Sequence, residues 1–198
     1  KTDEKYTHAV PACYKCNTPI EPQIRPQWFV AMTKAPKLGG ASLRDLAVAA
    51  VETGKITFVT ERFKNDFLRW MEHLRDWNIS RQIVWGIQIP AWFHEAKCVP
   101  RSGREADSTK CKEIVIAKTK PRCEFCDAEY QQDPDVFDTW FSSGQWPFAT
   151  LMTTGKDDFK TFYPTDVMAT ASDILFFWVA RMVMFGLYRT GAVPFKTV

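Results

Sequence analysis

The sequence predicts an α/β fold that ends in a parallel β-α-β unit and contains a metal-binding insert. Two strand-like runs, at residues 166–170 and 194–198, enclose an apolar segment at 173–188 that is long enough for a helix. This order favours parallel pairing of the two strands through a right-handed crossover. Between residues 93 and 132 the composition changes to cysteine, lysine, arginine, glycine and serine, which is typical of a small unit organised by a metal.

The composition limits the classes of function. With 198 residues, 45% of them hydrophobic, the chain can bury a core of one or two globular domains. The net charge of +3 is a weak bias toward anionic partners, far below that of a dedicated nucleic-acid-binding arm. Two C-x-x-C spacings and the lack of an apolar leader predict a reducing, cytoplasmic environment and metal thiolates instead of disulfides.

The first third of the chain predicts one strand and one helix. Prolines before residue 27 restrict the backbone, and the QWFV run at 27–30 predicts a strand. Ser42 is a suitable N-cap for a helix that runs to Val51 and ends at Thr53 and Gly54.

A strongly amphipathic helix is predicted from Glu61 to Trp77, with Thr60 as its N-cap. Its apolar side chains recur at helical spacing and are expected to form core: Phe63, Phe67, Trp70, Met71 and Leu74. The partly alternating run 81–92 predicts a strand leading to Pro90, and the IVIA run at 114–117 predicts a short one.

The apolar stretch 167–188 raises the question of a membrane span. Asp173 and Arg181 interrupt it, and ionised side chains are costly at bilayer depth. A buried helix is therefore expected, with no membrane partner. The final residues 194–198 read as a strand with no closing element after it, which suggests a cut inside a larger protein.

Four cysteines in the insert predict a structural zinc site. Cys98, Cys111, Cys123 and Cys126 could supply four thiolates in tetrahedral geometry, which leaves no open position for catalysis. His94 is the alternative fourth ligand.

Cys13 and Cys16 form a second C-x-x-C knuckle that lacks two ligands. It is expected to be an empty or reduced half-site, unless it shares the ligands of the first cluster.

Two long runs, NISRQIVWGIQIPAW at 78–92 and the stretch from Thr7 to Val30, resemble the branched-aliphatic subgroup of class I aminoacyl-tRNA synthetases. The runs DTWFSSGQWPF and DILFFWVARM are similar to the valine-specific members of that subgroup. The HIGH and KMSKS motifs and the hydrolytic editing domain are absent from this sequence.

The resemblance implies the second half of a Rossmann-type nucleotide-binding fold. Residues 1–92 would be a connective segment that follows the editing insertion, 93–132 a zinc-ribbon-like insert, and 133–198 the Rossmann half. The complete enzyme would be a cytoplasmic monomer that uses ATP, Mg²⁺, valine and the acceptor end of tRNA(Val). The chain alone is expected to be inactive.

The resemblance also assigns residues. Trp140, Ile174 and Trp178 match the walls of the valine pocket, and Asp173 matches the acidic residue that binds the ATP ribose. No catalytic side chain is expected, because the chemistry depends on positioning and on stabilising phosphate charge. Arg81 is expected to support the active-site floor or the tRNA acceptor end, or to form a structural salt bridge.

A second hypothesis is a free-standing zinc-ribbon module that binds nucleic acid through the basic side chains of the insert. For those side chains a solvated loop is the simpler interpretation. A third hypothesis is a folding unit with no ligand beyond zinc. Valine titration would separate these hypotheses from the synthetase interpretation.

Overall fold

The computed structural model describes residues 9–36, 39–94, 113–123, 126 and 129–198. Within them the elements, including a 3₁₀ turn η2 and a π-helical turn η3, run in this order: β1 (Phe29–Val30), α1 (Leu43–Glu52), α2 (Glu61–Glu72), β2 (Trp77–Asn78), β3 (Ser80–Arg81), β4 (Ala91–His94), β5 (Ile114–Ile116), β6 (Tyr130–Gln132), β7 (Val136–Phe137), α3 (Thr139–Ser143), α4 (Trp146–Thr154), α5 (Asp158–Phe162), β8 (Thr165–Val167), η2 (Ser172–Ile174), η3 (Leu175–Val179), α6 (Ala180–Thr190) and β9 (Phe195–Thr197).

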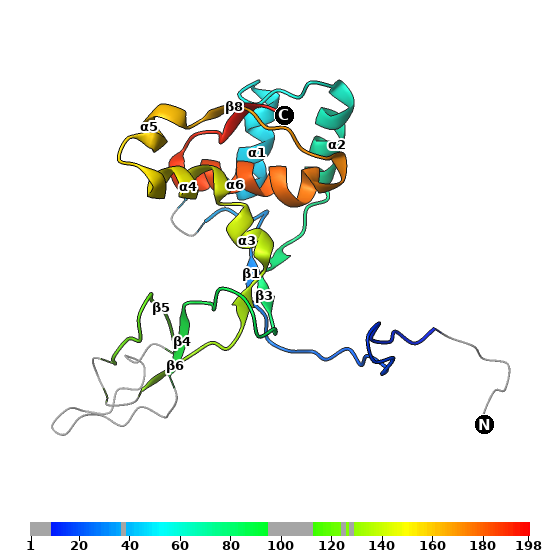
Figure 1. Ribbon diagram of the computed structural model, residues 1–198, viewed down its shortest axis with the longest axis vertical. Helices are drawn as coiled ribbons and strands as arrows, with labels where there is room; N and C mark the ends of the chain where they lie inside the picture. The colour runs from blue at the N-terminus through cyan, green and yellow to red at the C-terminus, as the bar shows by residue number, and fades with distance from the viewer. Residues whose placement is uncertain (1–8, 37–38, 95–112, 124–125, 127–128) are drawn as a thin grey trace.

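The strands form four small sheets. The antiparallel ribbons β1-β2 and β3-β7 lie between the helices and a three-stranded antiparallel sheet of order β5-β4-β6. Figure 1 shows that three-stranded sheet projecting away from the helices. Strands β8 and β9 pair in parallel, with η2, η3 and α6 between them, so the predicted β-α-β unit is confirmed.

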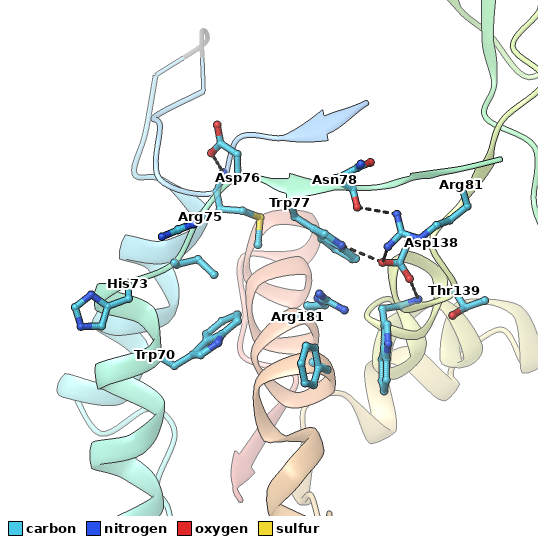
Figure 2. A pocket seen from close by; sticks show the side chains of 14 residues that line it. Trp70, His73, Arg75, Asp76, Trp77, Asn78, Arg81, Asp138, Thr139 and Arg181 are labelled. Carbon is cyan, nitrogen blue, oxygen red and sulfur yellow. Dashed lines mark hydrogen bonds and ion pairs between the residues drawn. The ribbon is translucent and has the colours of Figure 1, made fainter. Parts of the chain in front are cut away.

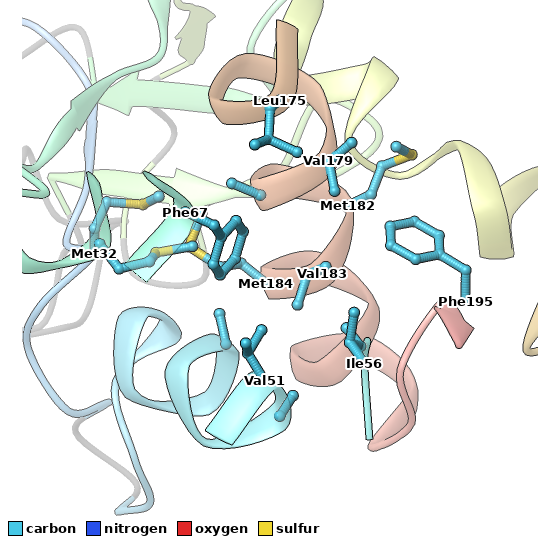
Figure 3. Close-up of a cluster of buried hydrophobic side chains, with 14 of the residues drawn as sticks. Met32, Val51, Ile56, Phe67, Leu175, Val179, Met182, Val183, Met184 and Phe195 are labelled. Atoms are coloured by element: carbon cyan, nitrogen blue, oxygen red, sulfur yellow. The ribbon is translucent and has the colours of Figure 1, made fainter. Parts of the chain in front are cut away.

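The main core surrounds α6, which packs against α1. Phe67 from α2, Val183 and Met184 from α6, and Phe195 from β9 are almost fully buried there (Figure 3). A second, smaller cluster contains Cys123, Cys126 and Tyr130. Because few apolar side chains fill this second cluster, the β5-β4-β6 sheet depends on other interactions for its stability.

The predicted first helix is confirmed at both ends. The Ser42 hydroxyl accepts a hydrogen bond from the Asp45 amide at 3.1 Å, which satisfies one of the unpaired donors of the first turn. At the other end the Thr53 amide donates to the Ala49 carbonyl, and Gly54 takes the left-handed conformation with φ 71°.

The second helix is shorter than predicted. It ends at Glu72 instead of Trp77, and Thr60 makes no side-chain capping bond. Trp77 leaves the helix because it pairs with Val30 in the β1-β2 ribbon and its indole hydrogen-bonds to Asp138. The predicted core role of the helix is confirmed, since Phe67 and Met71 are fully buried.

Two other predicted elements also differ from expectation. The run 81–92 is strand only at Arg81 and again from Ala91, because Gly86 turns the chain against β7 with φ 154°. An added Cβ at Gly86 would lie 2.7 Å from Cγ2 of Val136, so only glycine fits this approach. The helix predicted at 173–188 is composite: a 3₁₀ turn and a π-helical turn precede the regular α-helix.

Among the described residues, no helix combines the length and the apolar character that a membrane crossing requires.

Candidate functional site

Asp138 is a buried carboxylate that links two strands to the helix α3. It follows β7, serves as N-cap of α3, and is only 6% exposed. One carboxylate oxygen accepts from the Trp140 amide at 3.0 Å. The other accepts from Trp77 Nε1 at 3.1 Å and from Arg81 Nη2 at 2.6 Å. A single carboxylate therefore joins β2, β3 and the start of α3, and it fixes the backbone that carries Trp140.

A cavity of about 650 Å³ opens beside this carboxylate, between α2 and α3 and over the start of α6 (Figure 2). Aromatic side chains form much of its wall: Trp70, Trp77, Trp140 and Phe177. Arg181 stands inside the cavity with its guanidinium 3.9 Å from the centre of the Trp77 ring. Burial lowers the pKa of Arg181, whereas the Asp138 carboxylate opposes that shift.

The residues predicted for the valine pocket lie on three elements: Trp140 on α3, Ile174 on η2 and Trp178 on η3. Trp140 is the second residue of α3 and faces Phe177, with ring centres 6.2 Å apart. Trp178 lies in η3 and donates from Nε1 to the Ser143 carbonyl of α3 at 3.2 Å. The structure therefore brings Trp178 to the short helix that carries Trp140.

The cavity beside Asp138 includes one of the three predicted wall residues. Trp140 borders the 650 Å³ cavity, whereas Ile174 and Trp178 are not part of its wall. Both are half-buried, and Trp178 packs against the main core.

A second cavity, of about 300 Å³, lies at the carboxyl ends of β8 and β9. Its wall includes Met168, Thr170, Ser172 and Val198, and Oγ1 of Thr170 is buried without a hydrogen-bond partner among the described residues. In open α/β sheets, ligands bind outside the carboxyl ends of the strands. Asp173 follows this wall directly, in the 3₁₀ turn, and its side chain is exposed.

The β5-β4-β6 sheet brings three potential metal ligands together. Three side chains can each offer one donor atom, and these atoms lie within 4.8 Å of one another: His94, Cys123 and Cys126. His94 Nε2 is 3.1 Å from Cys126 Sγ. Both cysteines are buried, and the His94 ring meets the Tyr130 ring edge-on at 5.1 Å. Imidazole nitrogen and thiolate sulfur at this separation suit tetrahedral zinc, so the donor set fits the metal.

His94, offered by the sequence only as an alternative ligand, thus takes a place in the cluster beside the predicted Cys123 and Cys126. Cys98 and Cys111 lie outside the described residues.

Cys13 and Cys16 form the predicted knuckle. The Asn17 amide donates to the Cys13 carbonyl at 2.8 Å, and Asn17 takes a left-handed φ of 57°. In the described part of the chain no third ligand joins this pair. The Thr18 hydroxyl, 3.3 Å from the sulfur, and then the Thr18 amide lower the pKa of Cys16 to about 7.

Arg81 is partly exposed and makes structural contacts with Asp138 and the backbone. Besides its ion pair with Asp138, it donates to the carbonyls of Asn78 and Ser80 at 3.1 and 2.8 Å. The structural salt bridge, one of the two roles expected for Arg81, is therefore present. The joining role of Asp138 and the position of Arg181 inside a cavity were both missed by sequence reasoning, although the aspartate before TWFSS is a recognisable N-cap signal.

Comparison with known proteins gives a consistent result. The sequence profile of class I tRNA synthetases (I, L, M and V) matches residues 4–198. The valine–tRNA ligases of Symbiobacterium thermophilum, Dehalococcoides mccartyi and Solibacter usitatus are 44%, 43% and 45% identical to this sequence, each over 198 aligned residues. Each match covers 98% of this chain but only 19–21% of the relative. The chain therefore spans about a fifth of the length of these relatives.

Proposed function

The chain belongs to the class I tRNA synthetases of the I, L, M and V group, and from this membership we propose that it forms part of a valine–tRNA ligase. The observation that carries the proposal is identity of 42–45%, over nearly the whole chain, to relatives that are valine–tRNA ligases. The match includes both the helical unit and the β5-β4-β6 sheet. This extent favours a synthetase segment over a free-standing zinc-ribbon module.

The proposed reaction has two steps. The valine carboxylate attacks the α-phosphate of ATP to give valyl adenylate and pyrophosphate. A hydroxyl of the terminal adenosine of tRNA(Val) then attacks the acyl carbon, and AMP leaves. Mg²⁺ accompanies the ATP. The protein contributes by holding the reactants in line and by stabilising phosphate charge, so it needs no nucleophile of its own.

In this proposal Trp140, Ile174 and Trp178 form the walls around the valine side chain. The support is the arrangement of α3, whose N-cap Asp138 is fixed by three hydrogen bonds and whose Ser143 carbonyl holds Trp178. Rigid indoles restrict the space and would exclude isoleucine by bulk. Such a pocket rejects threonine only about a hundredfold, because the two side chains are nearly isosteric.

Asp173 would bind the ribose of ATP at the carboxyl ends of β8 and β9. The support is the neighbouring cavity of about 300 Å³ and the buried hydroxyl of Thr170 in its wall, which has no hydrogen-bond partner in the part of the chain that the structure describes. The exposure of Asp173 leaves its carboxylate accessible to a nucleotide.

The metal would be zinc held by His94, Cys98, Cys123 and Cys126. This set replaces one predicted cysteine by His94, because the imidazole already lies among the donors. We take Cys98 as the fourth ligand because only three residues separate it from His94 in the sequence, a spacing typical of zinc ligand pairs. The metal would stabilise a sheet that has little apolar core of its own.

Metal content and thiol titration test this ligand set. One zinc per chain and three reactive thiols, those of Cys13, Cys16 and Cys111, are expected. Two reactive thiols would instead indicate the four-cysteine site, and a folded chain without zinc would contradict both sets.

A chimera tests the proposed function. The matched 198 residues of the Symbiobacterium thermophilum valine–tRNA ligase are replaced by this chain, and amino-acid-dependent exchange of pyrophosphate into ATP is measured. Exchange that depends on valine more than on isoleucine or leucine is expected. A folded chimera that prefers another amino acid would contradict the proposal. The cytoplasmic location, the monomeric state and the tRNA contacts belong to the same proposal.

A further inference from the structure

The segment 133–138 joins the β5-β4-β6 sheet to helix α3. It begins directly after β6, passes through β7 and ends at the N-cap of α3, so it crosses the region between that sheet and the helices (Figure 1). A carboxylate stands at each end, Asp133 and Asp138, and each is only 6% exposed. Carboxylates are seldom buried unless donors satisfy them, so both ends of this segment are expected to be held in place.

Asp133 holds the first end to the sheet. Its carboxylate accepts from the Trp28 indole at 2.6 Å and from the Asp135 amide at 2.8 Å. Its own amide donates at 2.9 Å to the carbonyl of Ala91, the first residue of β4. Strand β4 ends at His94, one of the three potential metal ligands, which pairs there with β6. The bonds of Asp133 and the metal ligands therefore act on the same two strands.

The middle of the segment is hydrogen-bonded on both sides. The Ile89 amide donates to the Asp135 carbonyl at 2.9 Å, and the Phe137 amide donates to the Ile87 carbonyl at 2.8 Å. Strand β7 also pairs with β3. Phe137 then stacks on Phe141 of α3, with ring centres 4.4 Å apart and ring planes at 5°. A displacement of the first end is therefore transmitted toward α3 through an extended, bonded backbone.

Asp138 holds the second end to α3. Its carboxylate accepts from the Trp140 amide, from the Trp77 indole and from Arg81. Helix α3 has only five residues, and a helix this short is not stable by itself. Its order therefore depends on its N-cap and on whatever fixes the position of that cap.

The sheet supplies the two states that such a link needs. Its core contains few apolar side chains: Cys123, Cys126 and Tyr130, with Trp92 and Val115 packed against them. A core of this size contributes little stability, so bound metal would contribute much of it. Metal binding then favours an ordered sheet, and loss of the metal favours a loosened one.

We propose that residues 133–138 form a link through which the metal site of the sheet controls the order of α3. Order in β4 and β6 fixes Asp133, and the fixed segment presents Asp138 to the first turn of α3. Loosening of the sheet releases both. Because Trp140 of α3 borders the cavity of about 650 Å³, part of that wall depends on the metal site. The inference rests on the proposed metal site, but not on the proposed reaction.

Amide hydrogen exchange, followed by NMR on the ¹⁵N-labelled chain, tests the link. The zinc-loaded chain is compared with the chain after removal of zinc by a chelator, and zinc content is measured in both samples. The reporters are the amides of Trp140 and Gly144, which bond to the Asp138 carboxylate and the Trp140 carbonyl. The Thr53 amide, bonded at the end of α1, is the internal reference. Zinc removal should lower the protection of the two reporters at least about tenfold and that of Thr53 less than about twofold.

Two matched variants locate the path. Trp28→Phe removes the indole that donates to Asp133, whereas Trp92→Phe removes an indole of β4 that donates to the Ala117 carbonyl. Each variant loses one indole donor at the sheet, but only the first loses a bond to the segment. In Trp28→Phe the effect of zinc removal on α3 should fall below about threefold, whereas Trp92→Phe should keep an effect of about tenfold. If Trp28→Phe does not fold, Asp133→Asn serves instead, because an amide has one acceptor oxygen where the carboxylate has two.

Each contrary result has a distinct meaning. Unchanged protection of α3 after zinc removal would overturn the link. So would an equal loss at Thr53, since the metal would then hold the whole chain, or equal responses of the two variants, since the path would then avoid Asp133. A folded chain that binds no zinc would overturn the proposed metal site as well, and the zinc content separates this result from failure of the link alone. Since exchange of amides requires no catalysis, failure of the proposed reaction is distinguishable.

Discussion

Replacing Asp138 should destabilise the chain more than replacing any exposed carboxylate. Asp138→Ala removes the N-cap of α3, worth about 1 kcal/mol, and a hydrogen bond from the buried Trp77 indole to a charged acceptor, worth about 1.5–3 kcal/mol. The ion pair with Arg81 adds at most about 1 kcal/mol, because Arg81 is 40% exposed. The expected loss is therefore about 2.5–5 kcal/mol.

The assay is urea unfolding followed by tryptophan fluorescence, with the free energy of unfolding taken at constant m-value. Asp138→Asn separates the contributions, because asparagine still caps a helix but loses the charge. Its expected loss is about half that of the alanine variant. Asp166→Asn, which loses only an exposed ion pair with Lys196, is the matched control and should change stability by less than about 0.5 kcal/mol. A loss below about 1 kcal/mol for Asp138→Ala would refute the reasoning.

Three further predictions follow from other features. Phe67→Ala should cost about 3–5 kcal/mol in urea unfolding, because the ring is fully buried in the main core. Gly86→Ala should cost about 1–3 kcal/mol, because its Cβ would overlap Val136. Alkylation of Cys16 by iodoacetamide, followed by mass spectrometry, should rise with pH around a midpoint of about 7, since the depressed pKa gives thiolate above that pH. Thr18→Val should move this midpoint upward.

Each of these predictions has its own control or contrary result. Phe162→Ala, at a ring that is 55% exposed, should cost far less than the buried phenylalanine. Unchanged stability of the Gly86 variant would show that the chain turns there without close contact to β7. An alkylation midpoint near 9 for Cys16 would remove the role assigned to the Thr18 hydrogen bonds.

The sequence predicted local structure best where a short-range signal acts alone. Ser42 caps its helix because a serine hydroxyl reaches an amide three residues later, which requires no knowledge of the rest of the fold. The amphipathic stripe of α2 also predicted its buried face. The parallel pairing of β8 with β9 followed from the order of the elements.

Prediction failed where a partner distant in sequence decides the conformation. Trp77 has helical spacing with its neighbours, yet it pairs with Val30 and bonds to Asp138, 61 residues away. His94 was ranked behind a cysteine because spacing alone cannot show which side chains the β5-β4-β6 sheet brings together. The residues assigned to valine and ATP came from family resemblance, since periodicity carries no information on which ligand a wall contacts.

The surroundings of a charged side chain are also set by residues distant in sequence, as Arg181 shows. From the sequence, the charge of Arg181 indicated only that the apolar stretch 167–188 is not a membrane span. Its isolation among three aromatic rings arises from the crossing of α6 with β2 and α3, which no local pattern reports.

The central claim, that this chain supplies the walls of a valine pocket, is tested most directly by Ile174→Ala in the chimera. The measurement is the ratio of kcat/KM for isoleucine to that for valine in pyrophosphate exchange, with Val167→Ala as the exposed control. If Ile174 bounds the pocket, removing its side chain makes room for the extra methylene, and the ratio should rise at least about tenfold. An unchanged ratio, with valine activation intact, would contradict the account.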